Sequence, residues 1–208
     1  MNFFAHSVVA AWVDPNAPYV LGSMLPDFET MVGQRLLSPG DPIVKRGIDF
    51  HHRSDEVFHR AQPFTGLCRE ALRELVERGV RRGTARAVAH IGAEMFLDGL
   101  LAEDPVHAQA YLRALRAEQA SILQWPDQGA AFFELCERLQ AWGAPTDYLE
   151  PDFVLTRLER SLAARPKLRI ADEQRAAVSD YLPRLRGEVE HRAAELLKEV
   201  RSGLALRG

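Results

Sequence analysis

Apolar residues recur along most of this chain at the three- to four-residue spacing of an amphipathic helix, and the alternation typical of strands is nearly absent. Asp-Pro pairs at residues 41–42 and 104–105 have the form of a helix N-cap followed by proline at the first helical position. The pattern predicts helices over residues 2–13, 18–24, 42–60, 63–79, 84–101, 105–123, 128–141, 151–164 and 171–201.

Several helix ends are expected from single residues. The helix over 18–24 should end before Pro26, because the residue preceding a proline resists the α conformation. Thr84 is expected to cap the helix that runs to Leu101, and Pro183 to kink the last helix. With no internal repeat or linker in the pattern, we predict one all-α domain over residues 1–208, a helical bundle of about eight to nine helices.

Two of these helices each carry potential metal-coordinating side chains along one face, here called a stripe. The first stripe consists of His51, Asp55 and His59, and the second of His90, Glu94 and Asp98. Residues four apart on a helix are neighbours, so each stripe gathers imidazoles and carboxylates on one face. Such ligands suit a divalent ion such as zinc, manganese or iron, which in enzymes commonly activates water. The stripes therefore indicate a metal-dependent hydrolase.

The same side chains have a structural alternative. The helix around His90 is apolar on nearly every side, so its polar groups need partners, and an ion pair with Arg53 or Arg86 would satisfy that need as a metal would. Charged residues surround the first stripe, so its side chains could instead form an ordinary solvent-exposed helix face that binds no metal. His107 and His191 lie in charged segments and are expected to be exposed.

Composition narrows the classes of function. Of the 208 residues 47% are hydrophobic and 26% are charged, typical of a globular protein, and a net charge of −3 gives no basic field for nucleic acid. The two cysteines lack CxxC spacing, which indicates buried thiols in a reducing cytoplasm. No run of about 18 apolar residues predicts a membrane span. We therefore expect a cytoplasmic protein.

Four segments resemble the acyl carrier protein phosphodiesterases. The chain opens MNFFAH where that family has Asn-Phe-Leu-Ala-His, and LGSMLPDF at 21–28 matches its Gly-x-x-x-x-Asp-Phe stretch. GIDFHHRSD at 47–55 is similar to the family's Gly-Ile-x-x-His-Arg-x-Ile-Asp helix. Residues 94–99, EMFLDG, resemble a later Asp-x-x-x-Asp-His helix, and RPKL at 165–168 extends the similarity over most of the chain.

This resemblance implies an all-α fold related to the HD-type metal phosphohydrolases. It also implies hydrolytic release of 4′-phosphopantetheine from holo-acyl carrier protein with a divalent ion, usually manganese. The positions that match the family's polar residues are His6, Asp27, His51, Asp55, Glu94 and Asp98. Together with His59 and His90 from the stripes, the expected metal ligands are His6, Asp27, His51, Asp55, His59, His90 and Glu94.

The chain departs from the family at five positions. His52 stands where the family has arginine, Ser54 where it has isoleucine, His59 where it has aspartate and Gly99 where it has histidine, and His90 lies at a position that the family does not use for a ligand. A looser resemblance is to zinc-dependent phospholipase C, whose His-x-x-x-Asp and His-x-x-x-Glu pairs recur here in both stripes. The alternatives are therefore a phosphohydrolase of that type or a non-catalytic metal-binding protein.

In the expected mechanism, one or two ions activate water for attack on phosphorus. Asp98 or Asp55 would orient or deprotonate that water, and Arg53, with Lys45 or Arg46, would contact the phosphate. His52 is expected beside the ligands or at the phosphate. An acidic carrier protein would dock on basic residues, for which the candidates are Arg81, Arg82 and Arg86, or Arg165, Lys167 and Arg169.

Overall fold

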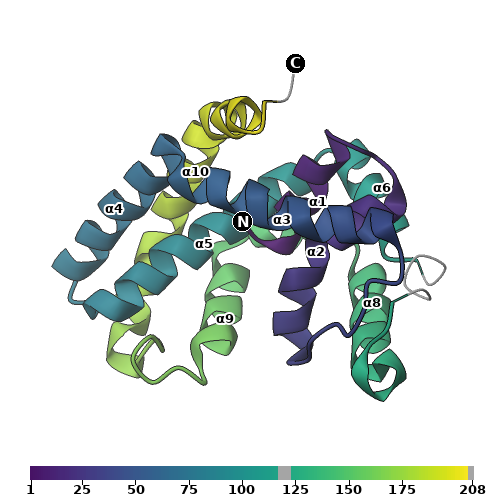
Figure 1. The fold of residues 1–208 in the computed structure, drawn as a ribbon. Coiled ribbons are helices and arrows are strands. Elements are labelled where there is room, and N and C mark those ends of the chain that lie inside the picture. Colours follow the sequence, from purple (N-terminus) through teal and green to yellow (C-terminus); the bar gives the residue numbers. More distant parts are fainter. Residues whose placement is uncertain (117–122, 206–208) are drawn as a thin grey trace. The chain divides into compact units, whose positions relative to one another are not determined.

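The computed structural model describes residues 1–116 and 123–205, and this part of the chain is helical throughout (Figure 1). It contains nine α-helices, α1 to α6 and α8 to α10, with two short 3-10 turns and no β-strand. Ser38 and Gln124 form one isolated antiparallel bridge. The prediction of an all-α chain is confirmed.

The chain divides into two compact units, which we describe separately. The first unit comprises Met1–Val57 and Leu101–Pro145, and the second comprises Phe58–Leu100 and Thr146–Gly208. Helices α3 and α5 contribute residues to both units. The expected single domain over residues 1–208 stays a prediction.

The first unit is built around two apolar N-terminal helices. Its elements are α1 (Phe3–Ala11), α2 (Ala17–Val32), most of α3 (Pro42–Arg60), α6 (Pro105–Ala114), η1 (Pro126–Gly129) and α8 (Ala130–Trp142). Helix α2 packs against α1, α6 and α8. Every residue from Phe3 to Ala10 is buried, so α1 lies inside the unit and places any polar side chain it carries in the core.

Helices α2 and α3 cross with their backbones in contact. A Cβ atom at Gly22 would lie 2.2 Å from the Val44 carbonyl oxygen, and one at Gly47 would lie 2.2 Å from the Tyr19 carbonyl oxygen. Only glycine fits at both positions of this crossing. The close approach sets Ser23 of α2 beside His51 of α3.

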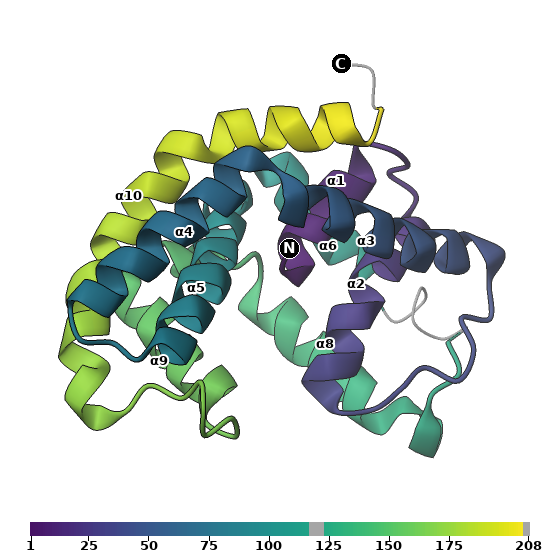
Figure 2. The same ribbon diagram turned by 60° about the vertical axis from the view of Figure 1, so that its left-hand side comes forward.

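The second unit contains the long C-terminal helix and its partners. Its elements are α4 (Gln62–Glu77), most of α5 (Arg82–Ala102), η2 (Thr146–Leu149), α9 (Pro151–Leu162) and α10 (Asp172–Gly203). Helix α10 packs along α4 and α9 and is visibly curved (Figure 2). It continues through Pro183, where the missing amide hydrogen removes one helical hydrogen bond without ending the helix.

Both predicted Asp-Pro helix starts are confirmed. Asp41 Oδ1 accepts a hydrogen bond from the amide of Ile43, and Asp104 Oδ1 accepts one from the amide of Val106 at 2.8 Å. In each case the carboxylate satisfies an amide that the first helical turn leaves without a backbone acceptor. The second of these helices was expected to reach residue 123 but ends at Ala114, with Leu115 as its C-cap, and residues 117–122 lie outside the described residues.

Two further predicted helix ends are wrong. Helix α2 continues past Pro26 to Val32, because burial of the residues on both sides of the proline outweighs one lost hydrogen bond, and Gly33 (φ 67°) ends it in the left-handed conformation. Thr84 lies inside α5 rather than at its start, and its hydroxyl donates to the Arg169 carbonyl oxygen at 3.1 Å. Among the described residues, none of the helices combines the length and apolar character needed to cross a bilayer.

Candidate metal centres

The predicted ligands assemble into two groups, and each lies within one unit. The first centre comprises His6 of α1, Asp27 of α2 and His51 of α3, and one ligand atom from each lies within 4.8 Å of the others. Two ligand atoms that share an ion at about 2.1 Å are at most about 4.2 Å apart. An ion therefore needs only a small side-chain adjustment to reach all three.

Hydrogen bonds hold both imidazoles of the first centre in a ligand-competent form. His51 Nδ1 donates to the Ser23 carbonyl oxygen at 2.8 Å, which leaves the lone pair on Nε2. Ser54 Oγ donates to the His51 carbonyl oxygen at 3.0 Å and lies 3.3 Å from His6 Nδ1. With the Ser54 proton directed at the His51 carbonyl, the Ser54 oxygen can accept the His6 Nδ1 proton, and in that tautomer the His6 Nε2 lone pair remains for an ion. Metal-binding histidines are commonly fixed in this way.

Burial keeps these two imidazoles uncharged. It is the main cause that lowers the pKa of the fully buried His6 to about 3 and that of His51, which is 7% exposed, to about 4. The rings stack with centroids 3.8 Å apart, an arrangement that two imidazolium ions would disfavour. Both histidines are therefore neutral near pH 7, the form that binds metal.

Asp55 lies at the edge of the first centre. Its Oδ1 is 3.5 Å from His6 Nε2 and 2.6 Å from the α-amino group of Met1. Its side chain is 34% exposed, whereas His6 is fully enclosed. Asp55 thus connects the buried ligands with solvent.

The second centre comprises His59 at the end of α3 and His90 and Glu94 on α5. His59 Nε2 lies 3.1 Å from His90 Nε2 and 3.0 Å from Glu94 Oε1, and His90 Nε2 lies 3.2 Å from the same oxygen. The three atoms form a nearly equilateral triangle. Since His90 and Glu94 are four residues apart, one face of α5 presents both of them.

The carboxylate of the second centre is ionised. Burial alone would raise the pKa of Glu94, but hydrogen bonds from His59 and His90 help to bring it below its ordinary value.

Phe64 packs edge-on against both imidazoles, with ring centroids 5.5 Å and 5.2 Å away, and holds their nearly parallel rings in place. This arrangement brings one carboxylate oxygen and two imidazole nitrogens, all potential metal ligands, to one point.

The remaining candidates lie outside both groups. Asp98 is fully buried on α5, and its carboxylate is not among the donor atoms of the second centre. His52 is exposed, with its ring edge-on to that of His51. The first predicted stripe is thus divided, because His51 joins residues of α1 and α2 whereas His59 joins residues of α5. In the second stripe His90 and Glu94 stay together and only Asp98 lies outside the group.

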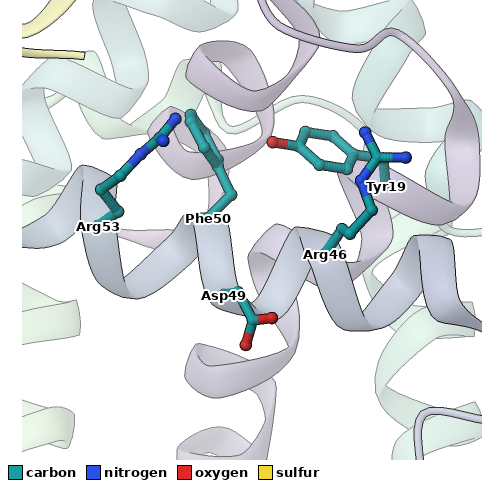
Figure 3. Close-up of a pocket in the computed structure, with 5 residues that line it drawn as sticks. All are labelled: Tyr19, Arg46, Asp49, Phe50 and Arg53. Carbon is teal, nitrogen blue, oxygen red and sulfur yellow. The ribbon is translucent and has the colours of Figure 1, made fainter.

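A cavity of about 290 Å³ lies on the first unit, lined by Tyr19, Arg46, Asp49, Phe50 and Arg53 (Figure 3). The Arg46 guanidinium lies 5.6 Å from the centre of the Tyr19 ring, and that of Arg53 lies 5.3 Å from the centre of the Phe50 ring. In Figure 3 the two rings lie between the two guanidinium groups, and Asp49 points away from them. The cavity pairs two cations with aromatic walls, which suits an anionic ligand that has an apolar part.

Sequence reasoning missed the groups that position the ligands. Ser23 acts through its backbone carbonyl, which no side-chain pattern reveals. Ser54 was noted only as a departure from the family's isoleucine, although its hydroxyl orients His6. His107 is also less exposed than expected, because its Nδ1 donates to the Leu101 carbonyl oxygen at 3.0 Å.

One departure from the phosphodiesterase pattern has a steric cause. A Cβ atom at Gly99 would lie 2.9 Å from the backbone of Tyr148 and Leu149 in η2, so this packing leaves no room for the histidine of the family.

Comparisons of the chain with protein-family models, with curated proteins and with solved structures found no match.

Proposed function

We propose that this protein is a metal-dependent phosphoester hydrolase whose catalytic ion binds at the first centre. The observation that carries the proposal is the convergence of two neutral, hydrogen-bonded imidazoles with the carboxylate of Asp27. The four-segment resemblance to the acyl carrier protein phosphodiesterases supplies the reaction class. Its implied substrate is holo-acyl carrier protein, and its implied ion is manganese.

The donor set fits such an ion. A bound divalent ion would supply a water of lowered pKa and neutralise charge on the phosphoryl group. His6, Asp27 and His51 would hold it, and the Ser23 carbonyl and the Ser54 hydroxyl would orient the two imidazoles. Two nitrogen donors and one oxygen donor accept manganese, zinc or iron.

Asp55 is the candidate proton acceptor of this centre. It is partly exposed and lies beside His6, so it can contact both the buried ligands and an incoming water. The role first expected of Asp98 stays a prediction, as does that of His52. Arg53 and Arg46 would hold the substrate's phosphate or another anionic group in the cavity of Figure 3.

The test is cleavage of bis-p-nitrophenyl phosphate by protein purified without a histidine tag. We expect slow hydrolysis that a chelator abolishes and that manganese or zinc restores. His51→Ala should lower the rate of hydrolysis at least about a hundredfold, because it removes a metal ligand and not merely a group that hydrogen-bonds to a ligand. His107→Ala is the matched control, an imidazole with a backbone partner outside both centres, and should keep the parental rate. A metal-loaded parent that cleaves none of a broad phosphoester panel would contradict the proposal.

The carrier-protein substrate is tested separately. Incubation with holo-acyl carrier protein should yield free 4′-phosphopantetheine and the apo-protein, which mass spectrometry of the carrier detects. An unchanged holo mass alongside cleavage of small esters would move the function to a general phosphohydrolase, including one of the phospholipase C type.

A non-catalytic role for the metal is the second candidate. The enclosure of His6 and His51 favours it, because a fully shielded ion exchanges water and substrate poorly. In that case zinc or manganese would raise the melting temperature of the parent, and no phosphoester on the panel would be cleaved.

A further inference from the structure

The second centre has the geometry of a metal site in its own right. Neighbouring ligand atoms that share one ion at about 2.0–2.1 Å are about 2.8–3.0 Å apart in octahedral and about 3.3–3.4 Å apart in tetrahedral coordination. The three distances between His59 Nε2, His90 Nε2 and Glu94 Oε1 are 3.1, 3.0 and 3.2 Å. An ion about 1 Å above the centre of this triangle would lie about 2.0–2.1 Å from all three atoms, so the side chains need almost no movement.

These three atoms can be held together by hydrogen bonds or by an ion. Neutral imidazoles that carry their proton on Nε2 donate to Glu94 Oε1, whereas rings that carry it on Nδ1 direct two nitrogen lone pairs at that oxygen. A divalent cation would bind all three lone pairs at once. The hydrogen-bonded alternative instead places two Nε2–H groups 3.1 Å apart, both directed at one oxygen.

We propose that His59, His90 and Glu94 bind a zinc-class divalent ion through a ligand set separate from that of His6, Asp27 and His51. Two imidazoles and one carboxylate form a His₂Glu donor set, for which zinc is a preferred ion among abundant divalent cations. The described residues contribute three donor atoms to this group, and water or a ligand from solution completes the coordination. The 42% exposure of the His90 side chain gives the ion a route to solvent.

The expected consequence is a link between two helices. His59 belongs to the last turn of α3, and His90 and Glu94 belong to the middle of α5, so the ion joins these segments within the second unit. Phe64 of α4 fixes the orientation of both rings, which makes the ligand set preformed. A preformed set binds its ion without first ordering side chains.

Zinc titration of chelator-treated protein without an affinity tag tests the proposal, with calorimetry and atomic absorption as readouts. The parent should bind two equivalents of zinc. His90→Ala and Glu94→Gln should each lose one equivalent, or bind it at least about a hundredfold more weakly. Glu94→Gln keeps the size and hydrogen-bonding capacity of the side chain, so it covers the case in which His90→Ala fails to fold. His191→Ala is the control, since this exposed imidazole on α10 belongs to neither centre.

His51→Ala separates the two centres. It should lose the other equivalent of zinc and leave the one that depends on Glu94 in place. In cobalt-loaded protein the visible absorption that remains in His51→Ala should disappear on adding Glu94→Gln. Parental zinc stoichiometry and affinity in Glu94→Gln and His90→Ala, with correct folding by circular dichroism, would overturn the proposal whatever the outcome of the phosphoester assays.

Discussion

At the residue scale, metal-binding character depends on the second nitrogen of each imidazole. In the first centre the Nδ1 atoms of His6 and His51 are engaged by Ser54 and by the Ser23 carbonyl, so the Nε2 lone pairs remain for an ion. In the second centre both Nε2 atoms already point at Glu94 Oε1. The same residue types thus form a deeply buried site in one unit and a half-exposed site in the other.

The buried imidazoles make the stability of the metal-free protein depend on pH. His6 and His51 have a pKa of about 3 and about 4 when folded, against 6.5 in an unfolded chain. As pH falls below 6.5 the unfolded chain takes up protons that the folded protein does not, so the folded state loses stability until its own pKa values are reached. We expect the free energy of unfolding to fall by about 1–2 kcal/mol per histidine between pH 7 and pH 5.

Urea unfolding of the chelator-treated protein at both pH values measures this effect. His51→Asn keeps a donor for the Ser23 carbonyl but does not titrate, so its unfolding free energy should fall less over this range than that of the parent. Equal losses in the parent and the variant would show that His51 is not buried in its neutral form.

At the element scale, the crossing of α2 and α3 determines whether the first centre forms. Gly22 and Gly47 allow backbone contact, and this contact brings the Ser23 carbonyl within 2.8 Å of His51 Nδ1. Pro26, one turn further along α2, is accommodated inside the helix just before Asp27. Helix packing rather than loop structure therefore assembles these ligands.

Gly47→Ala should separate the two helices. Its Cβ atom would lie 2.2 Å from the Tyr19 carbonyl oxygen, a backbone atom that no rotamer change can move. We expect a loss of about 2–3 kcal/mol of unfolding free energy, measured by urea denaturation, together with weaker metal binding at the first centre. Gly187→Ala in α10 is the control, because a Cβ there has no neighbour within 4 Å, and it should gain about 0.5–1 kcal/mol from helix propensity. Equal effects of the two substitutions would contradict the role of the crossing.

At the scale of the whole molecule, each of the two compact units contains one complete ligand set. All three ligands of the first centre lie in the segment Met1–Val57, and all three of the second lie in Phe58–Leu100. A chain with one ligand set in each unit can lose one ion and keep the other. The proposed zinc titration depends on this property, and it separates the question of metal binding from that of catalysis.

The helical class, most helix bounds and the residue types of both centres can be predicted from the amino-acid sequence. These depend on local interactions: the spacing of apolar residues, the capping carboxylates of Asp41 and Asp104, and the i, i+4 placement of His90 and Glu94. The positions of His6 and Asp27 came from the resemblance rather than from any periodicity.

Which ligands meet depends on how the helices pack. A helical stripe indicates which side chains share a face, but not what that face packs against. His51 and His59 are therefore predicted as one set, although they join different partners. Contacts between segments distant in sequence also explain why α2 continues beyond Pro26 and why no side chain fits at Gly99. Packing energy between helices outweighs a local preference at such positions, and that energy cannot be inferred from a single helix.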